Sequence, residues 1–372
     1  MEQTDKYFLA LSNLCINNPL FKAKLFEYFN FDIEKTFNAE SEDLKNFYAT
    51  NDGEISIPRD FLKKRDETDP DKIYEEFLNG AGALGVKYFT YNDEKYPKLL
   101  KNIPDFPLML YYKGEFDGIN IDRTVAFVGS RKASMNAKEA LNGIISGFLG
   151  TDIVVVSGLA EGIDARSHKS ALECGLKTIG VIGSGFKFTY PSSNKKLYTE
   201  IEQGGGVILS EYPYELPPMA HQFPQRNRIV VGMSYGTVVA EARMKSGAMI
   251  SARLTLDFNR ELMCMPGLIS NPNTEGIYYL LKNGASMVTN AEDILEALNW
   301  EAETSAGAAF APDVDGVEKE LYEIISIEAQ SMEDLSQKTS IPFDELMASL
   351  TSMELKGLIK QAGGNYFICK RN

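Results

Sequence analysis

The stretch that decides the fold is TVAFVGSRKASMN, residues 124–136. Its four consecutive apolar residues, Val125 to Val128, are typical of a strand buried on both faces of a sheet. The apolar run ends at Gly129, and a helical pattern begins a few residues later. A strand, a small-residue loop and a helix in this order predict one unit of a parallel sheet, whose ligands bind outside the carboxyl ends of the strands.

The same alternation continues along the middle of the chain. Amphipathic stretches at 134–150 and 162–175 separate short apolar runs and predict helices on both faces of a sheet. We therefore predict an α/β fold for the middle of the chain, with a doubly wound and mostly parallel sheet. Six runs are the predicted strands: 124–130, 152–158, 177–185, 205–211, 236–242 and 261–267.

The two flanks show different patterns. Apolar residues three and four positions apart predict a helical domain over 1–84, and short strands and turns over 85–114. The small, acidic and aperiodic stretch 299–316 is interpreted as a linker. Helical segments at 317–326, 332–340 and 342–359, followed by a hairpin turning at Gly363 and Gly364, predict a winged-helix domain over 317–372.

Composition and charge narrow the class of protein. The net charge is −14, but residues 1–120 and 299–372 each carry seven excess negative charges and residues 121–298 are neutral. A local basic pocket is therefore compatible with an acidic chain. No apolar run is long enough to span a bilayer, and the N-terminus lacks the features of a signal peptide, so we predict a cytoplasmic protein without membrane contact.

The cysteines and histidines do not suggest a metal site, and we predict neither a metal nor a cofactor. The four cysteines lack metal-site spacing, and Cys174, Cys264 and Cys369 lie among apolar neighbours, as buried thiols do. The two histidines are His168 and His221, and we interpret His168 as a surface residue of a helix.

Small residues follow several of the predicted strands at one edge of the sheet. Backbone N–H groups, hydroxyls and an arginine fork suit phosphate at such a place. Taken singly, each loop is also explained as a turn or a helix cap. Asp164 is expected either to cap the following helix or to orient Arg131. The candidates in the first three loops are Gly129, Ser130, Arg131, Ser157, Gly158, Ala160, Gly162, Asp164, Gly183 and Gly185.

Two later loops complete the candidate site. In HQFPQRNRIVVG (221–232), an aromatic residue and two arginines suit a stacked base and its neighbouring phosphates. The alternative is that the aromatic ring is core and the arginines pair with Glu211 or Glu241. The fifth loop follows the strand at 237–240 and is expected to form another anion cradle. The candidates in these loops are Phe223, Arg226, Asn227, Arg228, Glu241, Ser246 and Gly247.

Residues 85–298 resemble the DNA-processing protein A (DprA/Smf) family. The resemblance rests on FVGSR, VVSGLAEGIDARSH, GVIGSGFKFTYPSSN, FPQRNRIVVG and VVAEARMKSGAMISARL, in the order and spacing of that family. It implies that residues 85–298 form an extended Rossmann-like fold, a doubly wound and mostly parallel α/β sheet. It also implies a dimeric single-stranded DNA-binding mediator, not an enzyme, that protects incoming strands in natural transformation and helps to load the recombinase RecA. It also implies that Gly129, Ser130 and Arg131 hold a phosphate and that Phe223 stacks on a base or sugar. The flanks resemble a sterile-alpha-motif-like domain and a winged helix.

The sequence departs from the family pattern in two places. Only His221 stands where many members have a basic residue ahead of the phenylalanine, and the N-terminal stretch LSNLCINNPLFKAKLF (11–26) lacks a Gly-x-Gly hairpin, so we expect no helix-hairpin-helix contacts to DNA from that domain. The winged helix is likewise acidic, and its candidate recognition helix at 343–356 has Lys356 as its only basic residue. We therefore expect reduced affinity for DNA at neutral pH, and a winged helix that contacts protein, or nothing, rather than duplex DNA.

Two alternatives remain open. One is an enzyme, because YGTVVAEA resembles the Gly-Thr-x-x-Glu loop of Rossmann-like nucleotide phosphoribohydrolases, with Glu241 assisting loss of the base. The other is a sensor that binds a small nucleotide and signals through the winged helix.

Overall fold

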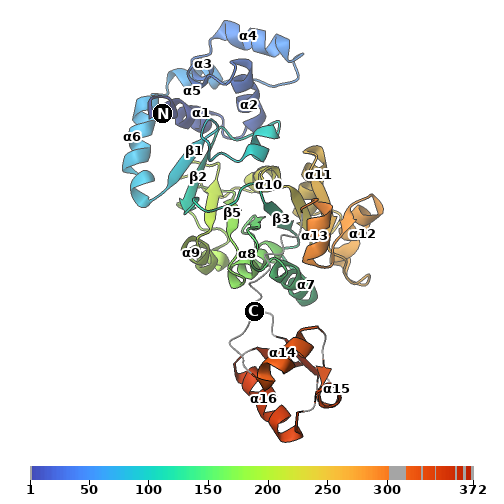
Figure 1. Ribbon diagram of the computed structural model, residues 1–372. Helices are drawn as coiled ribbons and strands as arrows, with labels where there is room; N and C mark the ends of the chain where they lie inside the picture. The colour runs from blue at the N-terminus through green and yellow to red at the C-terminus, as the bar shows by residue number, and fades with distance from the viewer. Residues whose placement is uncertain are drawn as a thin grey trace. The chain divides into compact units, whose positions relative to one another are not determined.

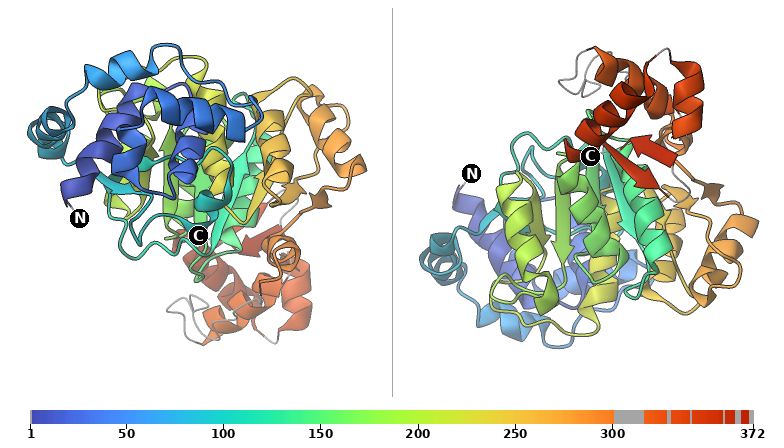
Figure 2. Two further views of the ribbon diagram at one scale, coloured as in Figure 1. Left: turned by 90° about the horizontal axis from the view of Figure 1, so that it is seen from above. Right: turned by 90° about the horizontal axis from the view of Figure 1, so that it is seen from below.

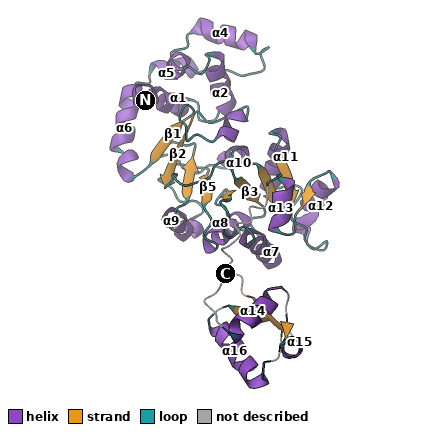
Figure 3. Cartoon of the chain, viewed as in Figure 1, coloured by secondary structure: helices purple, strands orange, loops and turns teal. Residues whose placement is uncertain are grey.

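The computed structural model describes residues 2–300, 316–327, 330–339, 341–356, 358–362 and 366–369. The chain divides into two compact units, Met1–Ala302 and Glu303–Asn372. Figure 1 labels their helices and strands, and Figure 3 colours them by type.

The described part of the first unit is organised around a nine-stranded sheet of order β1-β2-β6-β5-β4-β3-β7-β8-β9. Strands β3 to β9 pair in parallel, whereas β1 and β2 form an antiparallel extension at the β6 edge. All six predicted strands are confirmed, and so is the mostly parallel α/β class. The strands are β1 Lys87–Thr90, β2 Met109–Gly114, β3 Thr124–Val128, β4 Val154–Ser157, β5 Thr178–Ile182, β6 Val207–Ser210, β7 Gly236–Val239, β8 Glu261–Cys264 and β9 Ser286–Met287.

Helices cover both faces of the sheet because alternate residues of each strand point to opposite faces. In β3, Val125 and Phe127 join one apolar cluster, and Ala126 and Val128 join another. Helices α7 (Met135–Ser146), α8 (Ile163–Glu173), α9 (Lys195–Gln203) and α13 (Ala291–Ala297) pack on the first face, and α10 (Gln222–Gly232), α11 (Gly247–Asp257) and α12 (Glu275–Lys282) on the second.

The N-terminal helices share the apolar core on the second face. Phe21 and Phe26 belong to the same buried cluster as Tyr96 and Val239, and Figure 2 shows these blue helices from above, over the sheet. No break in packing marks the predicted boundary at 84/85, which stays a prediction. The elements are α1 Glu2–Leu14, α2 Pro19–Tyr28, α3 Ile33–Phe37, α4 Ser41–Thr50, α5 Phe61–Asp66, α6 Pro70–Asn79, η1 Gly82–Leu84 and η2 Lys98–Asn102.

The second unit has the helix and sheet arrangement predicted for a winged helix. Strands β11 and β12 pair antiparallel, as a hairpin requires, and β12 also pairs with β10. Most of the predicted linker, and Gly363 and Gly364, lie outside the described residues. The elements are α14 Val317–Ile327, β10 Gln330–Ser331, α15 Met332–Lys338, α16 Phe343–Leu355, β11 Ile359–Ala362 and β12 Tyr366–Cys369.

Within the described residues, no helix combines the length and apolar character that a membrane span needs.

Candidate nucleic-acid interface

The loops after β3 and β4 meet at one edge of the sheet because those strands are parallel neighbours. Gly162 has a φ of +81°, and a Cβ there would lie 2.1 Å from the carbonyl oxygen of Ser130. A Cβ on Gly129 would lie 2.5 Å from the Ile163 side chain. These glycines therefore let the two loops and helix α8 approach more closely than other residues allow.

A narrow pocket lies between the first three predicted loops and α10. Its volume of about 40 Å³ holds only one or two water molecules, so a larger ligand must rest at its mouth or displace a side chain. The lining residues are Arg131, Gly158, Ala160, Glu161, Gly183, Tyr190, Pro191, Phe223 and Arg226.

Aromatic rings and a cation form the rim of this pocket. The exposed Arg131 guanidinium lies 5.7 Å from the centre of the Phe223 ring. On the same ring packs Tyr190, with 5.1 Å between ring centres and 32° between planes. Tyr190 is 45% exposed and is not among the site residues predicted from the sequence. The signal was present, because an aromatic residue before Pro191 stands in the loop that follows the Gly183–Gly185 turn.

A buried cation, Arg226, forms the floor of the pocket, and a buried carboxylate, Asp164, lies behind Gly158. Arg226 donates from Nη1 to the carbonyl oxygens of Gly158 and Val181, the latter in strand β5. A Cβ on Gly158 would lie 2.5 Å from Arg226 Nη2 and 2.6 Å from Asp164 Oδ2, so both groups lie against this glycine. Arg226 is thus part of the scaffold beneath the pocket.

Burial perturbs both charged groups. Burial raises the pKa of Asp164, against the opposing effects of Arg226, the backbone N–H groups of Ala160 and Gly158, and Arg131. Burial also lowers the pKa of Arg226, which Asp164 opposes. Asp164 therefore holds the loop after β4 by accepting from its backbone N–H groups, and it balances the charge of Arg226. It does not cap helix α8, which has no side-chain cap.

Several candidates are engaged in the scaffold and do not line the pocket. Ser157 is fully buried and donates its hydroxyl to the carbonyl of Phe127 (2.6 Å). Ser130 accepts from the N–H of Lys132 within its own turn, and Gly185 packs against the backbone of the 213–214 loop. Asn227 accepts a hydrogen bond from Arg226 Nε (3.2 Å).

The predicted fourth loop is mostly helix, since α10 begins at Gln222, and this places Arg228 away from the pocket. Arg228 is buried and forms ion pairs with Glu211 (2.8 Å) and Asp105 (3.0 Å). This is the ion-pair alternative that the sequence left open for Glu211. The buried Lys22 of helix α2 lies near the same network, where burial lowers its pKa and Glu211 opposes that shift.

A separate hollow of about 640 Å³ lies between the start of α7 and the loops after β7 and β8, and of the predicted fifth-loop candidates only Glu241 lines it. Glu241 is buried there and accepts hydrogen bonds from the N–H and hydroxyl of Ser134 and from the Asn271 amide. Ser246 donates to the carbonyl of Arg243, and a Cβ on Gly247 would meet open space. The structure therefore does not bring Glu241, Ser246 or Gly247 to the pocket beside Arg131.

Two further predictions have definite outcomes. The prediction of a surface His168 is wrong, because its ring is fully buried and bonded to the Thr178 hydroxyl (2.7 Å), and burial lowers its pKa to about 3. Cys174 and Cys264 are buried free thiols, as predicted, whereas the Cys369 side chain lies outside the described part. Among described residues, no three His, Cys, Asp or Glu side chains gather as a metal site.

The fold and the pocket define a class: a Rossmann-like α/β protein with an arginine and aromatic rim at the carboxyl edge of its sheet, joined to a winged helix. The family profile described as "DNA recombination-mediator protein A" matches residues 87–299, and "DprA winged helix domain" matches residues 304–365. The chain belongs to the DNA-processing protein A (DprA/Smf) family.

Relatives and solved structures agree with that assignment. "Protein Smf" of Escherichia coli is 33% identical over 75% of this chain and 76% of its own length. The structure of DNA processing protein A from Streptococcus pneumoniae has a TM-score of 0.65 at 33% identity, covering 79% of this chain and 96% of that one. DNA processing protein A from Helicobacter pylori, described for its "single-stranded DNA binding mode", has a TM-score of 0.51 at 30% identity and covers 57% of this chain and 96% of that one.

Proposed function

We propose that the chain is a single-stranded DNA-binding mediator and that the pocket beside Arg131 grips the strand. The observation that carries this proposal is the exposed Arg131 guanidinium above the Phe223 ring, at the mouth of a pocket with small-residue walls. The cation suits a phosphate, and the adjoining rings suit a base or sugar of any sequence. Family membership and the stated property of the Helicobacter pylori relative support the same ligand.

The strand lies across the mouth of the pocket in this proposal. The pocket is too narrow for a nucleobase while Tyr190 packs on Phe223, so a base contacts the outer side of these rings or displaces Tyr190. Arg226 and Asp164 act indirectly, by holding the two glycine-rich loops in place.

The test is fluorescence anisotropy with labelled single- and double-stranded oligonucleotides over a salt series. We expect Arg131→Ala to weaken single-strand binding by about 1–3 kcal/mol, a factor of roughly 5 to 150, and to make the salt dependence shallower. Arg59→Ala is the matched control, since Arg59 is also exposed but lies among the N-terminal helices. Equal affinity of the wild type and Arg131→Ala would reject the assigned pocket.

Phe223→Ala separates stacking from charge. We expect a loss of about 1–3 kcal/mol in single-strand affinity with an unchanged salt slope, because stacking involves no counterion. If Phe223→Ala changed only the salt dependence of binding, the role of Phe223 would instead be to position the Arg131 guanidinium.

The partners and the biological role are also proposals. We propose a cytoplasmic homodimer that protects incoming single strands during natural transformation and helps to load RecA on them. Light scattering on the full chain measures the dimer. Strand-exchange assays with RecA measure the loading, with Arg131→Ala as the variant defective in DNA binding.

We propose binding without turnover. The enzymatic alternative requires Glu241 beside the phosphate site, yet both Glu241 oxygens bond to Ser134 or Asn271 in the separate hollow. Three residues also separate Thr237 from Glu241, one more than the Gly-Thr-x-x-Glu loop has. If the protein released free base from nucleoside monophosphates and Glu241→Ala abolished that activity, the enzymatic hypothesis would be restored.

A further inference from the structure

Helix α16 of the second unit has more apolar surface than its own core uses. Its inner side contributes Leu346, Leu350 and Met353, which are almost fully buried in the core of that unit. Its outer side carries Phe343 (59% exposed), Met347 (43%) and Leu355 (85%). These outer residues stand at four-residue spacing, or multiples of it, and therefore form one stripe along the helix.

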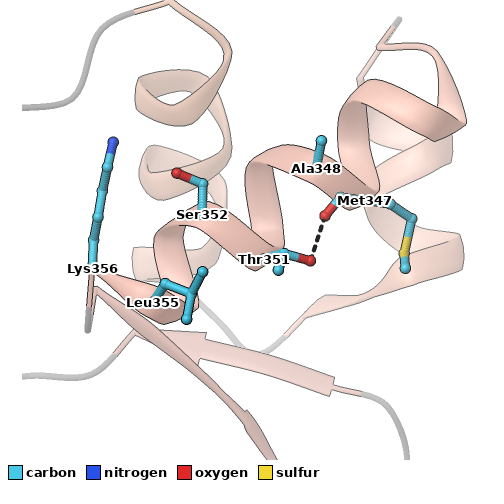
Figure 4. Close-up of a pocket in the computed structure, with 6 residues that line it drawn as sticks. All are labelled: Met347, Ala348, Thr351, Ser352, Leu355 and Lys356. Carbon is cyan, nitrogen blue, oxygen red and sulfur yellow. Dashed lines mark hydrogen bonds between the residues drawn. The ribbon is translucent and has the colours of Figure 1, made fainter.

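The polar groups within this stripe are already hydrogen-bonded. Figure 4 shows the residues that line a hollow on this helix and the hydrogen bond from the Thr351 hydroxyl to the carbonyl of Met347. The hollow has a volume of about 550 Å³, and the hydrogen bond is 2.8 Å long. Ser352 and Lys356 both donate to the carboxylate of Glu318 on helix α14. A partner can therefore cover this face without leaving those groups unpaired.

The charges around the stripe select the kind of partner. Asp344, Glu345 and Glu354 are exposed on α16, and the one lysine at its end, Lys356, is held in an ion pair with Glu318 (2.7 Å). A DNA backbone would meet an acidic helix, and a second α16 would meet its own carboxylates. Complementarity favours lysine or arginine flanking an apolar contact.

We propose that the outer face of α16, defined by Phe343, Met347, Thr351 and Leu355, is a docking surface for a positively charged amphipathic helix of another protein. In this family member the helix that a DNA-binding winged helix would place in the major groove recognises protein instead. The partner supplies leucine-like side chains to the stripe and cationic side chains to Asp344 and Glu345.

The test uses the full chain and two labelled synthetic helices of the same leucine face, one with lysine and one with glutamate on the polar face. Anisotropy is measured for the wild type, Met347→Ser, Leu355→Ser and the control Leu256→Ser, whose leucine is 58% exposed on α11. These side chains are exposed, so the fold is retained, which thermal melting checks.

We expect the lysine peptide to bind at least tenfold more tightly than the glutamate peptide. Met347→Ser and Leu355→Ser should each weaken it at least fivefold, and Leu256→Ser should leave it unchanged. Absence of binding, or equal binding in all four proteins, would overturn the proposal. Self-association, or duplex DNA binding, that Leu355→Ser abolishes while the lysine peptide does not bind would also overturn it and assign the face to that other occupant.

Discussion

Replacing Arg226 by methionine tests whether the charged floor holds the pocket together. Methionine keeps much of the volume but removes the buried cation that donates to Gly158 and Val181 and balances Asp164. Removing one partner of a buried charge pair costs about 3–5 kcal/mol, since the other charge stays buried without compensation. We expect a loss of that size in the free energy of unfolding at pH 7.5.

The remaining carboxyl gives this loss a pH dependence. Burial already raises the pKa of Asp164, and without Arg226 it rises further. The folded state then binds more protons than the unfolded state between the usual and the raised pKa, so stability falls as the pH rises through that window. The penalty of Arg226→Met should therefore be smaller at pH 5 than at pH 7.5.

Urea unfolding followed by tryptophan fluorescence provides the assay. The single tryptophan, Trp300, packs against Tyr235 in the first unit (5.5 Å between ring centres) and so reports its unfolding. The double variant Arg226→Met/Asp164→Asn removes the stranded charge and should recover at least about 1 kcal/mol at pH 7.5. A loss below about 1 kcal/mol, or no recovery in the double variant, would refute the reasoning.

Two further predictions use the same fluorescence assay. Gly162→Ala should lower the free energy of unfolding by about 2 kcal/mol or more, because φ at Gly162 is +81° and the new Cβ meets the Ser130 carbonyl. The control Gly143→Ala, on α7 with open space around it, should raise the free energy of unfolding by up to about 1 kcal/mol. Equal effects of the two substitutions would contradict the close approach of the two loops. Burial lowers the pKa of His168 to about 3, so the unfolded state binds more protons than the folded state below the usual pKa of 6.5. The protein therefore loses stability as the pH falls below 6.5, by about 2 kcal/mol at pH 5. His168→Leu should remove that part of the pH dependence.

The sheet and its pocket edge were readable from the sequence because each signal is local. Unbroken apolar runs such as Val125 to Val128 specify strands buried on both faces, and the glycines after them mark the loops. The order of strand, loop and helix implies parallel pairing, which brings successive strand ends to one edge. The sequence alone therefore predicts Gly129, Arg131, Gly158 and Phe223 as candidate site residues.

The tertiary structure alone decided which polar side chains line the pocket. Arg226 and Arg228 stand two residues apart on α10 and therefore point in different directions. Arg226 lies beneath the pocket, whereas Arg228 forms ion pairs with Glu211 and Asp105. Tyr190 reaches Phe223, 33 residues further along the chain, only because their segments converge in the fold. The burial of a side chain and its bonding partners depend on contacts between distant segments, which local residue patterns do not encode. The sequence by itself therefore determined the sheet and its loops, whereas tertiary packing determined where each charged side chain lies.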